Sequence, residues 1–272
     1  MSPAADSVID AQIRQACRQL HLPTIAGRAA ALSAEALREH QGHLSFLAAL
    51  LDAELEDRTE RRRHRRIAEA HFPRLKRLED FAFEEAPRIP AARIRELAGM
   101  GFVDRAEPLI FVGESGTGKS HLAIGLGIAA CLQSRRVRFV TTAALVNELR
   151  EARDDRSLSR VVARYARIEV LILDELAYVP LSPGDAELLF QVLDERSEVS
   201  SLITTTNLPF GEWTKIFPEP RLCKAVVDRL TFNAHIIETG TESWRFRKTL
   251  ERQRRRGPRA PADAASSERS AS

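Results

Sequence analysis

The sequence predicts an α/β fold: a mostly parallel sheet built around a glycine-rich loop and preceded by a small α-helical N-terminal domain. Three observations support this prediction. A glycine-rich loop lies between an apolar strand and an apolar helix, a second apolar strand ends in two carboxylates, and residues 8–76 follow a helical pattern throughout. The 272 residues are enough for one large domain or two modest ones with a sizeable core.

The composition is that of a soluble globular protein, with 29% charged residues, few aromatic residues and a formal net charge of +3. Cys17, Cys131 and Cys223 have no paired spacing, so neither a disulfide framework nor a zinc site is expected. No charged-then-apolar leader opens the chain, and the longest apolar run, Leu122 to Leu132, is too short to cross a bilayer. We therefore expect a protein of the reducing cytoplasm with no membrane contact.

The N-terminal segment is expected to form three helices. Ile13, Cys17 and Leu20 have the spacing of one helix face. A second helix is expected to start near Ser33 and a third at Ser45, which is a favourable N-cap residue. The third helix is expected to carry an apolar face inward, formed by Phe46, Leu47, Leu50, Leu51 and Leu55.

The third helix continues into a basic segment. Between Arg58 and Arg77 there are nine basic residues and two acidic ones, and five arginines lie within positions 61–66. A solvated helix face explains most charge runs, but this density exceeds what solubility needs. We therefore expect contact with nucleic acid here, with a protein partner as the alternative.

Residues 72–89 interrupt the helical pattern with two prolines and with Phe81 and Phe83, which alternate with small or acidic residues. This segment is expected to be a linker, or a strap that lies on the following domain. A short lead-in helix is expected next, with Phe102 packed in the core.

The strand expected at Leu109–Val112 leads directly into the glycine-rich loop. From Gly113 to Lys119 and Ser120 the spacing is that of a P-loop, which binds the phosphates of a nucleoside triphosphate. Backbone N–H groups of such a loop, together with the start of the following helix, attract an anion. Lys119 is expected to reach the β- and γ-phosphates, and the Ser120 hydroxyl to hold Mg²⁺. The expected nucleotide-binding residues are Gly113, Glu114, Ser115, Gly116, Thr117, Gly118, Lys119, Ser120 and His121.

The residues after this loop predict a strand at Val137–Val140 and two helices, Ala143–Ala152 and Ser157–Ala166. Arginines recur along these two helices at helical spacing; they are Arg150, Arg153, Arg156, Arg160, Arg164 and Arg167. A solvent-facing helix surface explains this pattern, and contact with DNA is the second interpretation.

A second apolar segment, Val170–Leu173, predicts a fully buried parallel strand, and Asp174 and Glu175 follow at its carboxyl end. Open α/β sheets bind their ligands at that end of the strands. We expect Asp174 to hold Mg²⁺ through water and Glu175 to orient and deprotonate the attacking water, since phosphoryl transfer depends on positioning and charge compensation. The sequence therefore predicts hydrolysis of the bound nucleotide.

Further polar residues follow in an ordered series. The strand Leu202–Asn207 ends in an amide that is expected beside the γ-phosphate, although an asparagine at this place is also a common turn residue. Arg229 then lies on a helix, a strand is expected at His235–Glu238, and Arg245 follows that strand. Isolated arginines are usually surface residues, so only the order of these elements singles out Arg229 and Arg245.

This order of motifs resembles that of the AAA+ ATPases, and within them the IstB family, ATP-dependent helpers of a DNA transposase with the DnaC-type helicase loaders as relatives. The resemblance covers about residues 10–250 and rests on GESGTGKSHLA, VLILDELAYVPLS, ELLFQVLDER, TTTNLPFGEW, VVDRL and SWR. By this match Asn207 is similar to sensor 1, Arg229 to the arginine finger and Arg245 to sensor 2.

Three positions depart from the family pattern. The family more often has Ser before the asparagine, a His pair after DRL and Tyr before the last arginine. In their places this sequence has Thr206, Phe232-Asn233 and Trp244.

The resemblance implies a division of the chain into four parts. A helical N-terminal domain over residues 1–77 binds a partner or DNA, and a linker with a lead-in helix follows over 78–105. An AAA+ ATPase domain spans 106–250 and a disordered basic tail 251–272. No C-terminal lid domain is expected, because few residues follow Arg245.

The resemblance also implies a function: a Mg²⁺-dependent, DNA-stimulated ATPase that oligomerises on target duplex DNA, holds ATP between neighbouring subunits and assists a transposase. The helices within 143–166 look like the extra insertion of the initiator clade, which lies toward DNA. Three alternatives stay open: a replicative helicase loader, whose N-terminal helices would bind a helicase, a regulatory DNA-binding module without hydrolysis, and a small-molecule kinase. The intact set of Lys119, Asp174 and Glu175 argues against the second, and the sequence shows no acceptor site or lid for the third.

Overall fold

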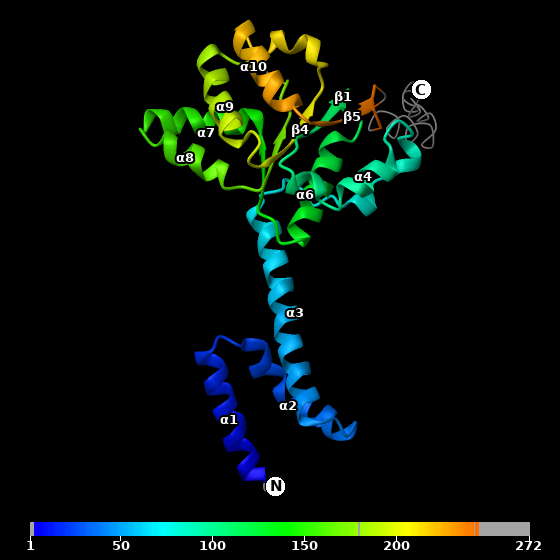
Figure 1. Cartoon of the computed structure of the whole chain (residues 1–272), viewed down its shortest axis with the longest axis vertical. Helices are drawn as coiled ribbons and strands as arrows, with labels where there is room; N and C mark the ends of the chain where they lie inside the picture. The colour runs from blue at the N-terminus through cyan, green and yellow to red at the C-terminus, as the bar shows by residue number, and fades with distance from the viewer. Residues whose placement is uncertain (1–2, 179, 242, 245–272) are drawn as a thin grey trace, which may run out of the picture.

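The computed structural model describes residues 3–178, 180–241 and 243–244, which form an α/β core and a helical arm that stands away from it (Figure 1). The arm consists of α1 (Pro3–Gln19), α2 (Pro23–Arg38) and α3 (His43–Glu69). The last turns of α3 reach the core, where the Arg63 side chain donates to the Leu132 carbonyl at 2.8 Å. The arm is therefore attached to the core through one long helix.

The core contains a five-stranded parallel sheet in the order β2-β3-β4-β1-β5. The strands are β1 (Leu109–Gly113), β2 (Val137–Thr141), β3 (Val170–Asp174), β4 (Ser201–Thr206) and β5 (His235–Gly240). Each overlaps the strand that the sequence predicts, except that β4 ends at Thr206 and Asn207 follows it directly. The parallel order confirms the predicted α/β class. Because β1 lies inside the sheet with β4 and β5 on either side, the loop after it is held by three strand ends.

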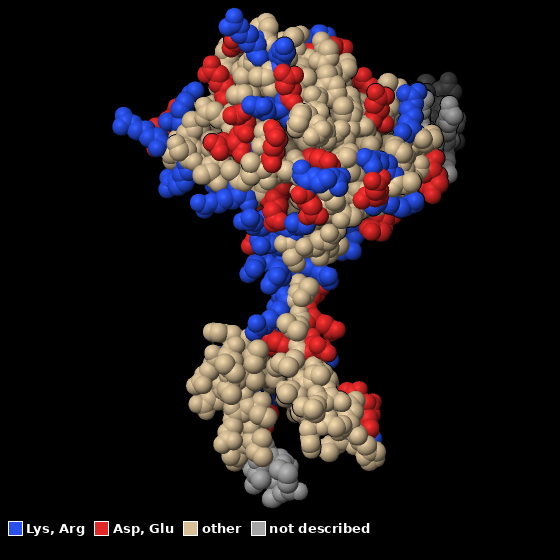
Figure 2. Space-filling view, viewed as in Figure 1, with Lys and Arg blue, Asp and Glu red and all other residues tan. Residues whose placement is uncertain are grey.

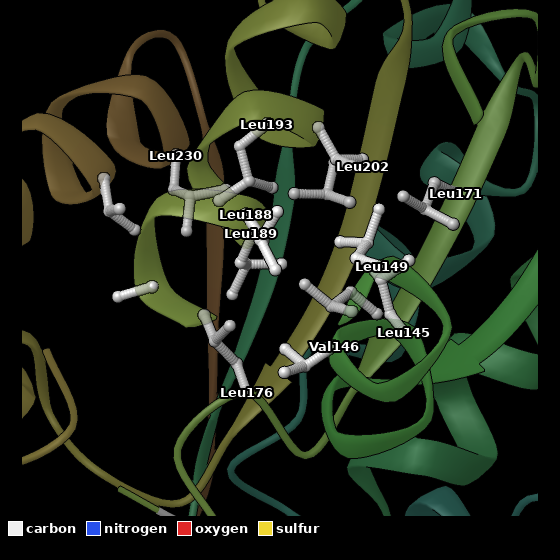
Figure 3. Close-up of a cluster of buried hydrophobic side chains, with 14 of the residues drawn as sticks. Leu145, Val146, Leu149, Leu171, Leu176, Leu188, Leu189, Leu193, Leu202 and Leu230 are labelled. Carbon is white, nitrogen blue, oxygen red and sulfur yellow. The ribbon is translucent and has the colours of Figure 1, made fainter. Parts of the chain in front are cut away.

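Helices cover both faces of the sheet. Alternate residues of β3 face opposite sides, so Leu171 and Leu173 join one apolar cluster while Val170 and Ile172 join the other. The first cluster is closed by α7 (Thr142–Asp154), α8 (Leu158–Ala166), α9 (Pro183–Arg196) and α10 (Pro220–Thr231), and part of it appears in Figure 3. The second is closed by α4 (Ala91–Leu97), α5 (Gly101–Asp104) and α6 (Lys119–Leu132). Both sides of the sheet are thus buried, as parallel sheets require.

Arg196, the last residue of the ELLFQVLDER motif, has a structural role in this packing. Its side chain is 2% exposed and donates to the carbonyls of Tyr165, Ile168 and Ser201. Burial lowers the pKa of the Arg196 guanidinium to about 9. Through these hydrogen bonds Arg196 links the end of α8 to the start of β4.

The segment between α3 and α4 is a strap on the surface of the core, as the broken pattern at 72–89 predicts. It contains two short 3-10 helices, Leu78–Asp80 and Phe83–Glu85. Leu78 lies so close to α6 that a Cβ atom on Gly125 would be 2.6 Å from its Cδ2 atom, which explains the glycine inside an otherwise apolar helix. Phe102 is 2% exposed in the core, so the packing role expected for it is confirmed.

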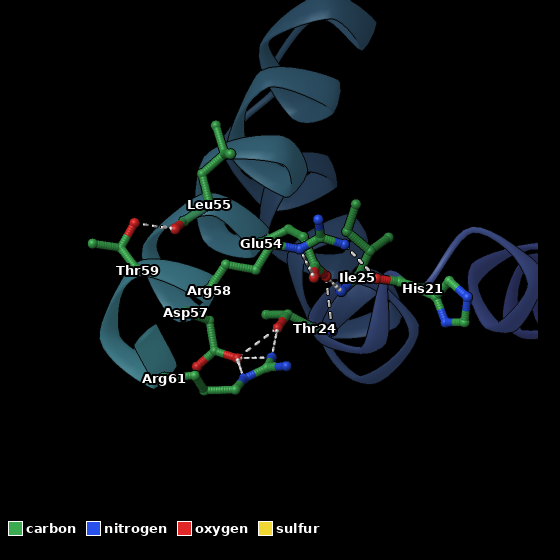
Figure 4. Close-up of polar contacts among 9 residues, drawn as sticks. All are labelled: His21, Thr24, Ile25, Glu54, Leu55, Asp57, Arg58, Thr59 and Arg61. Carbon is green, nitrogen blue, oxygen red and sulfur yellow. Dashed lines mark hydrogen bonds and ion pairs between the residues drawn. The ribbon is translucent and has the colours of Figure 1, made fainter. Parts of the chain in front are cut away.

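The arm is held together by polar contacts between α2 and α3 (Figure 4). The Glu54 carboxylate, 3% exposed, accepts hydrogen bonds from the N–H groups of Thr24 and Ile25 at 2.8 and 3.0 Å. These N–H groups belong to the first turn of α2, which has no partners for them within the helix. Burial opposes ionisation of Glu54, but the bonds from Arg58 and from the α2 backbone outweigh it and lower its pKa. Glu54 therefore caps α2 from the neighbouring helix.

Two helix starts differ from the predicted ones. Ser33 lies inside α2, which begins at Pro23, a residue whose fixed φ suits the first helical position. Ser45 lies in the first turn of α3, which begins at His43 after Gly42. The two serines therefore lie inside the helices and do not cap them: Ser33 lies several turns after the start of α2, and Ser45 lies in the first turn of α3.

The predicted inward face of α3 is wrong for three of its five residues. Leu50 is buried, whereas Leu47, Leu51 and Leu55 are 50%, 48% and 62% exposed. Of the sixteen large apolar side chains that are exposed in the described part of the chain, nine lie on the arm. The arm thus carries more of these exposed apolar side chains than the rest of the described chain. None of its helices, nor any other in the described residues, has the length and apolar character of a membrane span.

Candidate nucleotide-binding site

The glycine-rich loop joins β1 to α6, and the Lys119 side chain at its end folds back to contact the start of the loop. The Lys119 ammonium donates to the carbonyls of Gly113 and Glu114 at 2.5 and 2.7 Å. Gly118 precedes the helix with φ of +100°, and a Cβ atom there would be 2.6 Å from the Phe81 ring, so only glycine fits. The lysine therefore lies across the loop at the amino end of a 14-residue helix, where N–H groups and the helix dipole favour an anion.

The end of β5 supports the loop from one side, a contribution that sequence reasoning missed. The Glu114 N–H donates to the Gly240 carbonyl at 3.0 Å, and the hydroxyls of Thr117 and Thr239 are 2.6 Å apart. Thr239 also donates to the Val112 carbonyl at 3.2 Å. The signal available was the polar segment that follows the predicted strand at His235–Glu238.

The acidic pair at the end of β3 lies against the same loop. The Ser120 hydroxyl donates to Asp174 Oδ1 at 2.9 Å, which brings together the two residues expected to hold Mg²⁺. Asp174 is 6% exposed, whereas Glu175 is exposed and lines the cavity beside the loop. Glu175 has φ of +60°, a left-handed conformation that is costly for a residue with a Cβ atom.

A cavity of about 400 Å³ opens over the loop, within the range of small-molecule sites. Nine residues expected from the sequence line it: Ser115, Gly116, Thr117, Gly118, Lys119, Ser120, His121, Glu175 and Asn207. Gly113, Glu114 and Asp174 lie directly behind this lining through the contacts given above. Asn207 Oδ1 is buried, and none of the described residues donates a hydrogen bond to it. An acceptor without a partner in a cavity wall fits a bound water or ligand.

The strap forms a large part of the wall, and its residues were not predicted as site residues. It contributes Lys76, Asp80, Phe81, Ala82, Glu85, Ala86, Pro87 and Arg88. His121 belongs to this contact as well, because its Nε2 atom lies 2.9 Å from the Arg77 carbonyl and its ring meets Phe81 edge-on. The Trp244 backbone N–H donates to the Gly116 carbonyl at 3.1 Å, and its indole N–H donates to Glu85 of the strap at 2.5 Å. Because the chain returns to the loop from two distant segments, no short motif could reveal this wall.

Arg229 lies apart from this cavity. Its Nε atom is 2.9 Å from Asp194 Oδ1 on α9, and its side chain is 46% exposed. It lines a second cavity together with residues that precede β1 and β4, at the ends of the strands opposite to the glycine-rich loop. Arg245 lies outside the described residues.

The residues present fit a nucleoside triphosphate with a divalent cation. A lysine and a helix start provide positive charge for phosphates, and a serine and a buried aspartate in contact provide hard oxygen atoms of the kind that Mg²⁺ prefers. The buried acceptor on Asn207 and the exposed carboxylate of Glu175 lie on the same cavity wall.

Sequence comparisons agree with this chemistry. The family described as IstB-like ATP binding protein matches residues 15–252. An insertion sequence ATP-binding protein of Sinorhizobium fredii is 36% identical over 258 residues, which are 94% of this chain and 87% of the relative. The ATP-binding protein of insertion sequence IS5376 of Geobacillus stearothermophilus is 35% identical over 246 residues, 90% of this chain and 98% of the relative.

Structure comparisons agree on the fold. AMPPCP-bound DnaA from Aquifex aeolicus is similar with a TM-score of 0.53 at 18% identity, over 68% of this chain and 56% of that chain. A DNA replication initiation factor gives a TM-score of 0.53 at 17% identity, over 70% of this chain and 57% of that chain. At these identities the likeness shows the shared AAA+ fold and nothing further.

Proposed function

Because this chain belongs to the IstB-like ATP-binding protein family, we propose that it is an ATPase that works on DNA in transposition. It is an ATP-binding AAA+ protein of the kind associated with insertion sequences. The proposal adds four points: hydrolysis that depends on Mg²⁺, stimulation by DNA, assembly into oligomers on target duplex DNA, and assistance to a transposase in the cytoplasm.

The observation that carries hydrolysis is the contact between the glycine-rich loop and the acidic end of β3. Lys119 binds the β- and γ-phosphates, and Ser120 with Asp174 holds Mg²⁺, which neutralises charge on the phosphate oxygens when it is bound. Glu175, on the same cavity wall, orients the attacking water and accepts its proton. Asn207, with its unpaired buried oxygen, fixes the position of that water from the neighbouring strand.

The placement of Arg229 supports an interface site. A residue at the opposite strand ends cannot compensate charge on a γ-phosphate over its own loop. The Arg229 side chain is 46% exposed in a surface ion pair with Asp194, which a phosphate of a neighbour can replace. By the family match Arg245, which lies outside the described residues, would supply a second cation. Hydrolysis then depends on assembly.

The arginines divide into two groups, and only one group supports DNA contact. Arg58 and Arg61 hold the start of α2, Arg150 binds Asp185 at the start of α9, and Arg164 binds Glu148. Arg156, Arg160 and Arg167 on and beside α8 are exposed and form no ion pair with any described residue; Arg62 and Arg74 near the base of α3 are alike in this. Lys and Arg side chains gather where α3 meets the core and along the adjoining edge of the α7–α8 pair (Figure 2). This group is the proposed phosphate-binding surface.

The arm supports a protein partner. Its apolar surface includes Leu44, Leu47 and Leu51 on α3, which are 82%, 50% and 48% exposed. Contiguous exposed apolar side chains mark interaction sites in soluble proteins. We assign this surface to the transposase, since the relatives are encoded by insertion sequences. A helicase loader would use the same surface, and capture of a helicase instead of a transposase would favour that alternative.

Nucleotide binding and hydrolysis by single variants test the proposal. Lys119→Ala should raise the dissociation constant for ATP by about two orders of magnitude, because charge-assisted hydrogen bonds of about 1.5–3 kcal/mol each are lost. Glu175→Gln should bind ATP as the wild type does and hydrolyse it poorly. Lys215→Ala, which removes an exposed lysine paired with Glu212, serves as the control. Equal ATP affinity for Lys119→Ala and wild type would refute the site.

A further inference from the structure

The hydroxyl of Thr205 on β4 contacts both acidic residues at the end of β3. It donates to Asp174 Oδ1 at 2.5 Å and accepts from the Glu175 N–H at 2.9 Å. The directions are fixed, because an ionised carboxylate can only accept and a backbone N–H can only donate. Thr205 is 1% exposed and also accepts from the Leu176 N–H through its carbonyl at 2.9 Å. We propose that Thr205 is a positioning residue that holds Asp174 and Glu175 in the geometry needed for hydrolysis, an inference that rests on the proposed ATPase function.

The place of Thr205 in the sheet explains why a side chain is needed there. Paired residues of β3 and β4 end at Leu173 and Thr204. Beyond that point the chain turns sharply at Glu175, whose φ of +60° is a sparsely populated conformation for a non-glycine residue. Such a conformation is costly and persists only where the surroundings hold it. The Thr205 hydroxyl accepts from the Glu175 N–H and is one of the contacts that hold this turn, together with the bond from the Leu176 N–H to the Thr205 carbonyl.

Asp174 receives two hydroxyl groups on the same oxygen. Ser120 donates to Oδ1 from the glycine-rich loop, and Thr205 donates to Oδ1 from β4. The carboxylate is therefore fixed between the loop and β4, the strand that Asn207 directly follows. Thr205 links three parts of the site in this way: the Mg²⁺-binding aspartate, the glutamate beside it and the strand that leads into the asparagine.

The neighbouring threonines make different contacts. Thr204 donates to the Leu173 carbonyl at 2.9 Å, and Thr206 bonds with the backbone of Leu208 in the following turn. Thr204 and Thr205 are equally buried, at 0% and 1% exposure, and each donates to β3 or the residue that ends it. Thr204→Val therefore reproduces the loss of a buried hydroxyl on the same strand without touching the acidic side chains.

The test compares Thr205→Val with Thr205→Ser and Thr204→Val in the full-length protein. Thr205→Val should lower kcat for ATP hydrolysis by about 10–100-fold, the loss found when a partner of a metal ligand is removed. ATP affinity without Mg²⁺ should stay unchanged, while the increase in affinity on adding Mg²⁺ should shrink. Thr205→Ser should restore both quantities, and Thr204→Val should keep the wild-type kcat and Mg²⁺ response. If Thr205→Val does not fold, Thr205→Ala, which has no branched side chain to fit, replaces it.

The outcomes separate this inference from the proposed function. Wild-type kcat and Mg²⁺ response in Thr205→Val would overturn the positioning role, as would an equal loss in Thr204→Val or a failure of serine to restore activity. Glu175→Gln, measured alongside, reports on the site itself. If Glu175→Gln hydrolyses ATP at the wild-type rate, the proposed function fails. If Glu175→Gln is inactive and Thr205→Val is normal, only the role of Thr205 is wrong.

Discussion

The arm and the core treat their apolar side chains in opposite ways. In the core, Leu171 and Leu173 of β3 are fully buried between two layers of helices. On the arm, Leu44 and Leu47 of α3 are 82% and 50% exposed, and the contacts that hold α2 to α3 include the buried carboxylate of Glu54. The core therefore buries its apolar side chains within the chain, whereas the arm leaves some of them exposed to contact another molecule. This difference suggests that nucleotide chemistry and partner choice are separate properties of two regions joined by α3 and the strap.

The largest expected effect is on the free energy of unfolding, in a comparison of Leu171→Ala with Leu47→Ala. Leu171→Ala should lower the free energy of unfolding of the core by about 2–5 kcal/mol, because a fully buried leucine leaves a cavity. Leu47→Ala, at a half-exposed position, should change it by less than about 1 kcal/mol and should instead weaken capture of the partner. Denaturant unfolding and pull-down with the cognate transposase measure the two effects. A loss of stability in Leu47→Ala equal to that in Leu171→Ala would show that the arm surface is part of a core.

A smaller effect is expected at Glu54. Glu54→Gln should reduce the stability of the α2–α3 contact by about 1–3 kcal/mol, because the buried network loses its negative charge and one of its two acceptor oxygens. Hydrogen exchange in α1 and α2 should rise, with little change in the sheet. Glu35→Gln, an exposed substitution on α2, should leave exchange unchanged. Equal exchange in Glu54→Gln and wild type would mean that Glu54 does not hold the arm.

The pH dependence of the same contact has a defined sign. The pKa of Glu54 is lowered from its usual value of 4.5, so its contribution to stability is present above that value and is lost as the pH falls through the lowered pKa. The protection factors of α2 amides in the wild type, which correct for the pH dependence of the intrinsic exchange rate, should therefore fall on acidification below about 4.5. The fall should be smaller in Glu54→Gln, in which Asp57, whose pKa is lowered by hydrogen bonds from Thr24 and Arg61, still titrates.

Much of the core follows from the sequence because its signals are local. Most strands are short apolar segments, and the P-loop spacing and the Asp174-Glu175 pair each lie within a few consecutive residues. The strap wall, the Thr239 support and the Thr205 contact could not be predicted, because each joins segments far apart in the sequence. On the arm, helical spacing alone could not show which side of α3 faces α2. For this reason the prediction that Leu47, Leu51 and Leu55 face inward is wrong.

Similarly, charge counts could not show which arginines are already engaged. Arg58 and Arg61 stand in the same basic run as Arg62, yet the first two bind Glu54 and Asp57. Only the fold shows that these acidic residues lie within reach. The proposed DNA surface therefore leaves out Arg58 and Arg61 and includes Arg62, Arg74 and the unpaired arginines on and beside α8.

The smallest expected effect concerns that DNA surface. Replacing Arg156, Arg160 and Arg167 by alanine should flatten the dependence of log K on log salt by roughly 2.7, since each phosphate contact on duplex DNA contributes about 0.9. ATP binding should be unaffected. The control replaces Arg14, Arg28 and Arg38, three exposed arginines of the arm, and should leave the slope as it is. DNA binding at several salt concentrations measures both slopes, and equal slopes in both triple variants would return these arginines to ordinary surface charges.

The central claim is that ATP is hydrolysed between neighbouring subunits, and mixing two inactive variants tests it directly. Arg229→Ala should bind ATP but hydrolyse it slowly, because an arginine finger contributes about 10³–10⁵ in rate, and Glu175→Gln should be inactive for lack of the glutamate. Arg221→Ala, on the same helix and exposed, should stay active. In mixed assemblies some sites combine an intact Glu175 with a neighbour's intact Arg229, so activity should partly return on mixing. Mixtures that co-assemble and yet remain as inactive as their components would contradict the account.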